Sequence, residues 1–558
     1  MLKKTDTRPS TGAKVVVDML ESRGVEYVFG IPGAKIDAVY DALVDSRIQT
    51  IVCRHEQNAA FMAGAIGRMT GKAGVTIVTS GPGVSNLVTG LATANSEGDP
   101  VVAFGGAVAT NEALKQLHQT MDAVSICKPV TKFSASVNAP NMVTEVIANA
   151  FRAAETGRPG AAFVSLPKDV MAAQMNATLL TAPAFAGQGV ADQAAIAEAA
   201  RLISAAKNPV VLLGLLASRE VNANAVRSLI KRADLPVVGT YQAAGAVSER
   251  LLDHFGGRVG LVTNQQADQL LAVADLVITI GYDPIEFEPS LWNRSGERTI
   301  IHIDALPADL DSCYCPQVEL VGDIAQTLDV LAPQITRTER STVSVELLKS
   351  IAQERAQFRE LAAHRNGYPI HPTRIVYELQ QFVGPDVTVC VDMGSFHIWL
   401  ARHLYSFRAR QMLMTNGQQT LGVALPWAIA ATLVRPTEKV LSISGDGGFL
   451  FSSMELETAV RLKANIVHLI WIDGTYDMVA AQEVLKYGRS SGTDFGPVDP
   501  VKYAEAFGAT GMMIRSADEI GPVLKKAFDT PGPVIVGLHV DYRDNHKLFE
   551  QVDANAFH

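Results

Sequence analysis

Short apolar runs rich in valine and isoleucine alternate with helix-like stretches along the whole chain. Runs of this kind are typical of parallel strands buried on both faces, with helices as the connections between them. The strand-like runs lie at 51–53, 75–79, 210–213, 235–238, 276–280, 299–303, 387–391, 440–444 and 466–472. The pattern therefore predicts an α/β protein built from doubly wound parallel sheets.

The runs fall into three blocks, and a chain of 558 residues is too long for a single hydrophobic core. We expect an N-terminal domain over 1–182, a central Rossmann-like domain over 192–335 and a C-terminal domain over 365–558. A stretch rich in proline, alanine and glycine at 182–191 is predicted to be a linker. A polar segment from about 333 to 372 is predicted to lead into the third block.

Composition and charge exclude several classes of protein. The net charge of −9 argues against a nucleic-acid partner, because no basic surface would offset the phosphates. No secretory signal is visible, and the longest apolar run, near 209–217, is about half of the ~20 residues that a membrane span needs. The five cysteines form no Cys-x-x-Cys pair, and Cys313 and Cys315 are too close together for a usual zinc site. We expect a soluble, reduced, cytoplasmic protein with no membrane partner.

The most informative motif is Gly445-Asp446-Gly447-Gly448-Phe449, which directly follows the run at 440–444. A helix is predicted over 451–463, and the next strand ends at Asp473-Gly474-Thr475. Asp473 lies 27 residues after Asp446, which is the length of one strand–helix–strand unit. Parallel strands expose their carboxyl ends on the same side, so the two aspartates are expected to meet there.

This pattern suits a phosphorylated cofactor held through a metal ion. Glycines let the backbone approach bulky oxygens, and the N-terminus of the following helix favours negative charge. Carboxylates and a backbone carbonyl are ligands for Mg²⁺, which neutralises a diphosphate. The alternative is that Gly-Asp-Gly is only a tight turn after a strand.

The run from Gly445 to Met478 resembles the thiamine diphosphate signature, in which Gly-Asp-Gly is followed by asparagine at about this spacing. This sequence departs from the signature by carrying Asp473, which is also an oxygen ligand for Mg²⁺. The resemblance implies that Asp446 and Asp473 bind the metal through side chains and Thr475 through its carbonyl. It implies cofactor contacts from Gly445, Asp446, Gly447, Gly448, Asp473, Thr475, Tyr476 and Met478.

The first block contains the acid that such an enzyme needs. Arg54-His55-Glu56-Gln57-Asn58 follows the run at 51–53 and resembles the family's segment in which a glutamate hydrogen-bonds the aminopyrimidine ring. A carboxyl in an apolar pocket favours its protonated form, which suits proton exchange with that ring. A surface glutamate after a strand is the competing interpretation.

Other loops resemble family segments that line the cofactor. They contribute Pro32 and Gly33 after one strand, Pro82 and Asn86 after another, and Asp392, Gly394, Ser395 and Phe396 in the third block. Leu421 matches the bulky side chain that bends the cofactor, with the Gln419 carbonyl as acceptor for its amino group; a core leucine is the alternative. The family builds its site between two chains, which implies at least a homodimer, or a tetramer.

From Ala13 to about Val540 the chain resembles the acetolactate synthase (acetohydroxyacid synthase) family, and it is most similar to the catabolic, FAD-independent branch of the bacterial acetoin and butanediol route. Biosynthetic members bind FAD through a glycine-rich loop and an Arg/Asp-rich segment. The matching positions here, 214–218 and 281–286, lack those glycines and the arginine, and Glu286 and Glu288 add negative charge. We expect no FAD.

The resemblance implies that one pyruvate is decarboxylated on thiamine diphosphate and that its hydroxyethyl unit is ligated to a second pyruvate, giving 2-acetolactate and CO₂. Gln482 stands where biosynthetic members carry tryptophan, which favours pyruvate as the acceptor, although one apolar contact discriminates by only ~1–3 kcal/mol. Gln119 and Lys35 are candidates for holding substrate, and Lys35 could equally be a solvated helix charge. The alternatives are a pyruvate oxidase, a simple 2-oxo acid decarboxylase, or a cofactor-binding homologue without catalysis.

Overall fold

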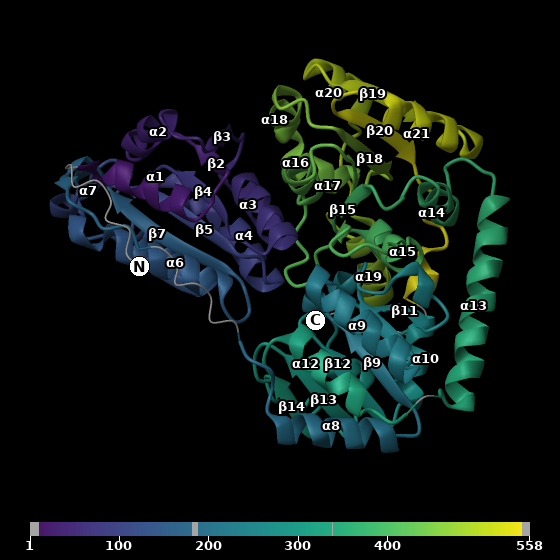
Figure 1. Ribbon diagram of the computed structural model, residues 1–558. Helices are drawn as coiled ribbons and strands as arrows, with labels where there is room; N and C mark the ends of the chain where they lie inside the picture. The colour runs from purple at the N-terminus through teal and green to yellow at the C-terminus, as the bar shows by residue number, and fades with distance from the viewer. Residues whose placement is uncertain (1–9, 181–187, 338, 550–558) are drawn as a thin grey trace. The chain divides into compact units, whose positions relative to one another are not determined.

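The computed structural model describes residues 10–180, 188–337 and 339–549, and these residues form three six-stranded parallel sheets with helices between the strands (Figure 1). The α/β class predicted from the apolar runs is confirmed. No helix in the described ranges is long and apolar enough to cross a membrane. The first residues of the linker predicted at 182–191 lie outside the described ranges.

The first sheet is formed by the N-terminal part of the chain. In spatial order its strands are β3 (Gln49–Val52), β2 (Tyr27–Ile31), β4 (Gly74–Val78), β5 (Val101–Ala107), β7 (Ala161–Pro167) and β6 (Phe133–Ser136), and all neighbours are parallel. A short antiparallel pair, β1 (Ser10–Thr11) with β8 (Gln174–Met175), lies beside it in sequence. The central strands β4, β5 and β7 are almost completely buried, which is why they are nearly uninterrupted runs of apolar residues.

Helices cover both faces of the first sheet. They are α1 (Gly12–Ser22), α2 (Asp37–Val44), α3 (Glu56–Thr70), α4 (Pro82–Glu97), α5 (Ala123–Cys127), α6 (Val143–Glu155) and α7 (Lys168–Ala172). The apolar sides of α1, α2 and α6 share one core with the sheet, and α3 and α4 pack against each other on the other side (Figure 1). An added Cβ at Gly90 would lie 2.4 Å from the Cβ of Ala60, so glycine allows α3 and α4 to approach this closely.

The central sheet has the spatial order β11 (Phe255–Val259), β10 (Val237–Thr240), β9 (Pro209–Leu213), β12 (Leu276–Ile280), β13 (Thr299–Asp304) and β14 (Val318–Val321). Its helices are α8 (Gln193–Ala205), α9 (Glu220–Ala233), α10 (Gln266–Val273), α11 (Pro289–Trp292) and α12 (Ile324–Leu331). The third sheet has the order β16 (Met412–Leu413), β15 (Val387–Val391), β17 (Lys439–Gly445), β18 (Ile466–Ile472), β20 (Val534–His539) and β19 (Thr510–Ile514). Its helices are α14 (Pro372–Gln380), α15 (Ser395–His403), α17 (Asp446–Ser452), α19 (Asp477–Tyr487), α20 (Pro500–Ala506) and α21 (Ile520–Asp529).

Four predicted elements differ from the structure by two residues or more. The strand expected at 51–53 is β3, which begins two residues earlier, at Gln49. The strand expected at 235–238 begins two residues later, because Leu235 and Pro236 complete the turn that follows α9. The helix expected over 451–463 begins at Asp446 and breaks into α17, the 3-10 turn η8 (Ser453–Glu455) and α18 (Leu456–Arg461). The polar segment expected at 333–372 contains α13 (Thr342–Ala363), whose buried face is narrow.

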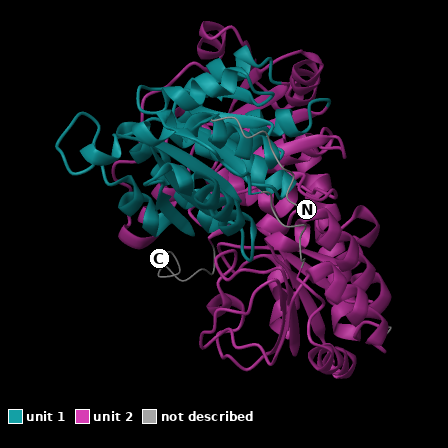
Figure 2. Cartoon of the chain, turned by 60° about the vertical axis from the view of Figure 1, so that its left-hand side comes forward, with its two compact units in different colours: residues 1–186, 425–437, 452–464 teal, residues 187–424, 438–451, 465–558 magenta. Residues whose placement is uncertain are grey.

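The chain divides into two compact units (Figure 2). The first comprises residues 1–186 together with 425–437 and 452–464, so it includes most of α16 (Ala424–Val434) and all of η8 and α18. The second comprises the central and third sheets. Two short segments from late in the sequence therefore complete the unit that the N-terminal part of the chain begins.

Each sheet has one position where the strand order reverses direction. In the first sheet it lies between β2 and β4, in the central sheet between β9 and β12, and in the third sheet between β15 and β17. The loops that leave two such strands diverge and open a crevice at the carboxyl ends of the strands, where ligands of α/β proteins bind.

Candidate active site

A cavity of about 210 Å³ opens in the second unit, beside the carboxyl ends of β15 and β17. The predicted residues that line it are Gly394, Ser395, Phe396, Gln419, Leu421, Gly445, Asp446, Gly447, Gly448, Asp473, Thr475, Tyr476, Met478 and Gln482. The structure therefore brings nearly all of the predicted site residues of the third block to one cavity. Asp392 is the exception, because its carboxylate lies behind the cavity wall.

The two aspartates of the motif occupy the ends of adjacent parallel strands, β17 and β18. Asp446 accepts hydrogen bonds from the backbone N–H groups of Gly447 at 3.0 Å and Gly474 at 2.9 Å. Asp473 has a buried Oδ2 without a hydrogen-bond partner. Burial raises the pKa of Asp473 to about 8, and the charge of Asp446 contributes to the same shift. A cation between these carboxylates would remove the repulsion and satisfy the unpaired oxygen.

No group of three or more His, Cys, Asp or Glu side chains within 10–180, 188–337 and 339–549 is arranged to hold a metal ion. The predicted set is of another kind, with two carboxylates and the backbone carbonyl of Thr475. The Thr475 hydroxyl donates to the carbonyl of Thr493 at 3.2 Å, which fixes the loop that carries this carbonyl. The residues present therefore fit a divalent cation that also takes ligands from a bound diphosphate.

Two glycines of the motif bring the start of α17 close to neighbouring side chains. A Cβ at Gly447 would lie 2.7 Å from Cε1 of Tyr476, and a Cβ at Gly448 would lie 3.2 Å from Oδ2 of Asp392. Because α17 begins at Asp446, its N-terminus lies at the carboxyl end of β17, where the helix dipole favours a bound anion; the Gly447 N–H is already bonded to Asp446.

Asp392 connects the end of β15 to the loop that carries Leu421. It is 1% exposed, and its two oxygens accept from the Gly422 N–H at 2.9 and 3.0 Å, while Oδ1 also accepts from the Met393 N–H. Burial raises the pKa of Asp392 to about 7. Gln419 has a φ angle of 49°, in the left-handed region that residues with side chains rarely adopt, and Gly422 has a φ angle of 84°, which glycine adopts freely.

Glu56 lies in the first unit as the first residue of α3. It is 8% exposed, and its Oε2 accepts a hydrogen bond from Nδ2 of Asn86 at 2.9 Å. The competing interpretation of Glu56 as a surface residue is wrong. Glu56 lies where α3 packs closely against α4, which supplies Asn86 and approaches α3 at Gly90 and Ala60.

The loops after β2 and β4 also meet, at the point where the strand order of the first sheet reverses. A Cβ at Gly33 would lie 2.6 Å from Cβ of Thr79, so only glycine fits between the loops that carry Pro32 and Pro82. Gln119 has a φ of 63° and accepts from the Ser80 hydroxyl at 3.3 Å. Gln119 lines a cavity of about 460 Å³ at this edge of the sheet, and Lys35 does not.

The corresponding crevice of the central sheet is closed by the chain itself. The Glu286 carboxylate is 2% exposed and accepts from the Leu215 N–H at 3.0 Å and from the Thr240 hydroxyl. Burial raises the pKa of Glu286 to about 8. From the sequence we expected Glu286 to add negative charge that disfavours FAD. In the structure the carboxyl group of Glu286 is buried at the end of β9.

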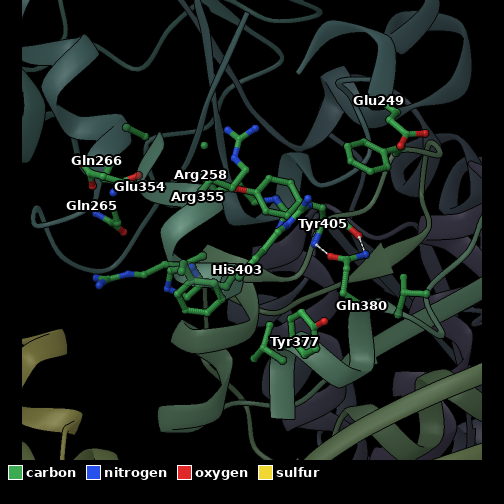
Figure 3. A pocket seen from close by; sticks show the side chains of 18 of the residues that line it. Glu249, Arg258, Gln265, Gln266, Glu354, Arg355, Tyr377, Gln380, His403 and Tyr405 are labelled. Carbon is green, nitrogen blue, oxygen red and sulfur yellow. Dashed lines mark hydrogen bonds between the residues drawn. The ribbon is translucent and has the colours of Figure 1, made fainter. Parts of the chain in front are cut away.

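A larger cavity of about 1010 Å³ lies between β11, α13 and α14 and contains none of the predicted residues (Figure 3). Two of its arginines already have partners within the chain. Arg258 donates to the carbonyls of Ala401 and Leu404, and Arg355 stacks over the ring of Tyr405 at 5.0 Å. This cavity offers no arrangement of acids or nucleophiles comparable to the smaller one.

Sequence reasoning missed Asp477 and Tyr542, which line the smaller cavity together with Met393 and Val479. Asp477 accepts from the Ser395 hydroxyl and from the Asn545 amide, and burial raises its pKa. Asp477 could have been identified from the sequence, because it is an acidic residue at the first position of the helix that follows Thr475. Tyr542 had no local signal, because it reaches the cavity from the far end of the chain.

Three family models match the chain in order. Residues 10–126 match "Thiamine pyrophosphate enzyme, N-terminal TPP binding domain", residues 196–331 the central domain, and residues 392–538 the C-terminal TPP binding domain. The chain is 54% identical to "Acetolactate synthase, catabolic" of Raoultella terrigena over 97% of both chains. It is 51% identical to "Acetolactate synthase" of Bacillus subtilis over 96% of this chain and 94% of that one. It is 30% identical to "Acetolactate synthase isozyme 1 large subunit" of Escherichia coli over 99% and 98%.

Proposed function

Because the chain belongs to the acetolactate synthase family of thiamine pyrophosphate enzymes, we propose that it joins two pyruvates into 2-acetolactate with release of one CO₂. The observation that carries the proposal is the cavity of the third sheet, where Asp446 and Asp473 lie with Leu421 and Gln482. An acidic pair for a metal, a bulky apolar side chain and a polar residue beside them are the parts that this reaction needs.

Asp446, Asp473 and the carbonyl of Thr475 would hold Mg²⁺, and the diphosphate would lie against Gly447 and Gly448. The unpartnered Oδ2 of Asp473 supports this assignment, since a buried carboxylate oxygen without a partner is costly unless it binds a cation. The loop contacts of Asp446 with Gly474 keep the two carboxylates at one end of the sheet.

When bound, thiamine diphosphate supplies a carbanion and accepts the electrons left by the departing CO₂. The part of this chain is to hold and orient it. Glu56 would exchange a proton with the aminopyrimidine ring, and its bond from Asn86 fixes the carboxyl in place. Leu421 would support the bent form of the cofactor, with the carbonyl of Gln419 as acceptor for the amino group.

The proposal includes no FAD. The Leu215 N–H at the end of β9, which a bound anion would need, is already engaged by Glu286. Gln482 on α19 supports pyruvate as the acceptor, because it offers no apolar surface for a longer side chain. Gln119 would hold substrate from the first sheet; Lys35, half-buried just before α2, has less structural support for that role.

We also propose that two chains share each site, in a homodimer or a tetramer. Glu56 belongs to one compact unit and the aspartates to the other. Several large apolar side chains on α17 and α19 are exposed, which supports a partner surface: Leu450, Phe451, Val479, Val484, Leu485 and Tyr487. All five cysteines are free thiols, which supports a reducing compartment such as the cytoplasm and a role in the acetoin and butanediol route there.

The test is product analysis by NMR with purified protein, Mg²⁺, thiamine diphosphate and pyruvate, without added FAD. We expect acetolactate as the main product, and we expect Glu56→Gln to abolish it. Acetaldehyde would indicate a simple decarboxylase, and acetate formed only with FAD would indicate an oxidase. Unchanged turnover in Glu56→Gln would refute the proposed role of Glu56, and no product under any condition would favour a homologue without catalysis.

A further inference from the structure

The loop that carries Glu56 is held by a carboxylate from a distant part of the sequence. Glu455, at the end of η8, is completely buried within the first unit. Its Oε1 accepts from the backbone N–H groups of Arg54 at 2.8 Å and His55 at 3.0 Å. The same oxygen accepts from Nδ2 of Asn58 at 3.1 Å. One oxygen atom thus fixes the residues on both sides of Glu56.

The other contacts of this segment act in the same direction. Oε2 of Glu455 accepts from the Thr458 hydroxyl at 2.7 Å, which fixes the orientation of the carboxylate. The guanidinium of Arg461 donates to the carbonyl of Val52, at the end of β3. The β3–α3 loop is therefore bound at its beginning, at its middle and in the first turn of the helix that follows.

We propose that Glu455 is a positioning residue for Glu56. Two consecutive N–H groups bound to one carboxylate fix the backbone dihedral angles just before Glu56, and these angles determine the direction of its side chain. Asn86 then holds the carboxyl end of that side chain. Glu455 thus determines where the carboxyl group of Glu56 lies, and Asn86 holds the carboxyl group in that position.

Substitutions at position 455 distinguish a role of the hydrogen bonds that Glu455 accepts from a role of its charge. Glutamine at 455 retains the Oε1 acceptor for all three donors and loses the charge and the Oε2 acceptor of the Thr458 hydroxyl, whereas alanine leaves three donors in a buried loop without their acceptor. Aspartate keeps the charge but withdraws the acceptor by one methylene. Glu457 is a matched control on the same segment, because it is half-exposed and bonds only to the side chains of Arg54 and Arg461.

This inference rests on the proposed role of Glu56, so the experiment measures the step that Glu56 is proposed to drive. The exchange rate of the thiazolium C2 proton with deuterium is followed by NMR on the Mg²⁺ and thiamine diphosphate holoenzyme, without substrate. Far-UV circular dichroism and the unfolding temperature are recorded for the same samples. We expect Glu455→Ala and Glu455→Asp to slow exchange by about 10- to 100-fold, as misplacement of a catalytic group by about 1 Å does. Glu455→Gln and Glu457→Ala should exchange close to the wild-type rate.

The outcomes distinguish the two claims. Slow exchange in Glu56→Gln together with wild-type exchange in a folded Glu455→Ala or Glu455→Asp protein would overturn the role of Glu455 alone. Wild-type exchange in Glu56→Gln would overturn the role of Glu56 and this inference with it. If Glu455→Ala does not fold, the exchange rate of Glu455→Asp decides whether Glu455 positions Glu56. Slow exchange in Glu455→Gln would mean that the charge of Glu455 matters rather than its position, which also contradicts the proposal.

Discussion

Replacing Asp392 with alanine should weaken cofactor binding although Asp392 does not line the cavity. Its carboxylate accepts from the Gly422 N–H with both oxygens, and these contacts hold the turn that presents Leu421. Alanine leaves that N–H buried without its acceptor, at a cost of about 1–3 kcal/mol. The positive φ angle of Gln419 is unfavourable for a residue with a side chain, so the turn is expected to relax at this residue once the contact is lost.

The expected magnitude follows from this cost. If relaxation of the turn must be reversed whenever the cofactor binds, 1–3 kcal/mol corresponds to a Kd for thiamine diphosphate that is roughly 5- to 150-fold higher. Asp392→Asn keeps one acceptor oxygen and resembles the protonated carboxyl, which burial favours by raising the pKa of Asp392 to about 7. Its Kd should therefore lie between those of the wild type and Asp392→Ala.

The measurement is isothermal titration calorimetry with thiamine diphosphate at saturating Mg²⁺. Asp386→Ala is a suitable control, since Asp386 is exposed and immediately precedes β15. A folded Asp392→Ala protein that binds the cofactor as tightly as the control would refute the reasoning, because the turn would then keep its shape without the carboxylate.

Two further predictions concern stability. Burial raises the folded-state pKa of Glu286 from its usual value near 4.5 to about 8, so the folded state holds a proton that the unfolded state has lost, and stability falls as the pH rises from about 4.5 to 8 and levels off above 8. The unfolding temperature of the wild type should fall more between pH 5 and 8 than that of Glu286→Gln, and parallel curves by differential scanning calorimetry would contradict this. Arg68 bonds Asp99 at 2.8 Å and Glu97 at 3.3 Å, all of them buried, so Arg68→Ala leaves two buried acids and should lower the free energy of urea unfolding by about 3–5 kcal/mol. A loss below about 1 kcal/mol, typical of an exposed ion pair, would show that these acids find other partners.

The sequence was sufficient where a local pattern determines the structure. The runs at 387–391, 440–444 and 466–472 are strands because a mostly apolar segment followed by glycine or aspartate suits a parallel sheet, and the meeting of Asp446 and Asp473 followed from the direction of those strands. The family resemblance read from these motifs is confirmed by the relatives. The burial of Glu56 did not follow from its place after a strand, which equally suited a surface glutamate; the resemblance of its segment to the family pattern favoured the buried position.

Features that depend on distant contacts were not predictable in this way. Helix α13 was read as a polar connection because only a few of its residues are buried, including Leu348 and Ile351. Tyr542 and Glu455 reach their sites from remote parts of the chain, so no spacing rule identifies them. The start of α17 at Asp446 was missed because glycine usually disfavours a helix, whereas here it admits the neighbouring Tyr476 and Asp392.

The first compact unit ends its N-terminal portion at residue 186 but also needs residues 425–437 and 452–464. Residues 187–464, about 280 residues, are made after the N-terminal portion and before the unit is complete, and a ribosome adding about 5–20 residues per second needs roughly 14–56 seconds to add them. Over that interval the loop of Glu56 lacks the Glu455 carboxylate, and Arg68 on α3 lacks the ring of Trp427 on α16 over which it lies. The nascent chain therefore has a defined period in which the segment around Glu56 is not yet held, and this period ends once residues up to 464 have been made.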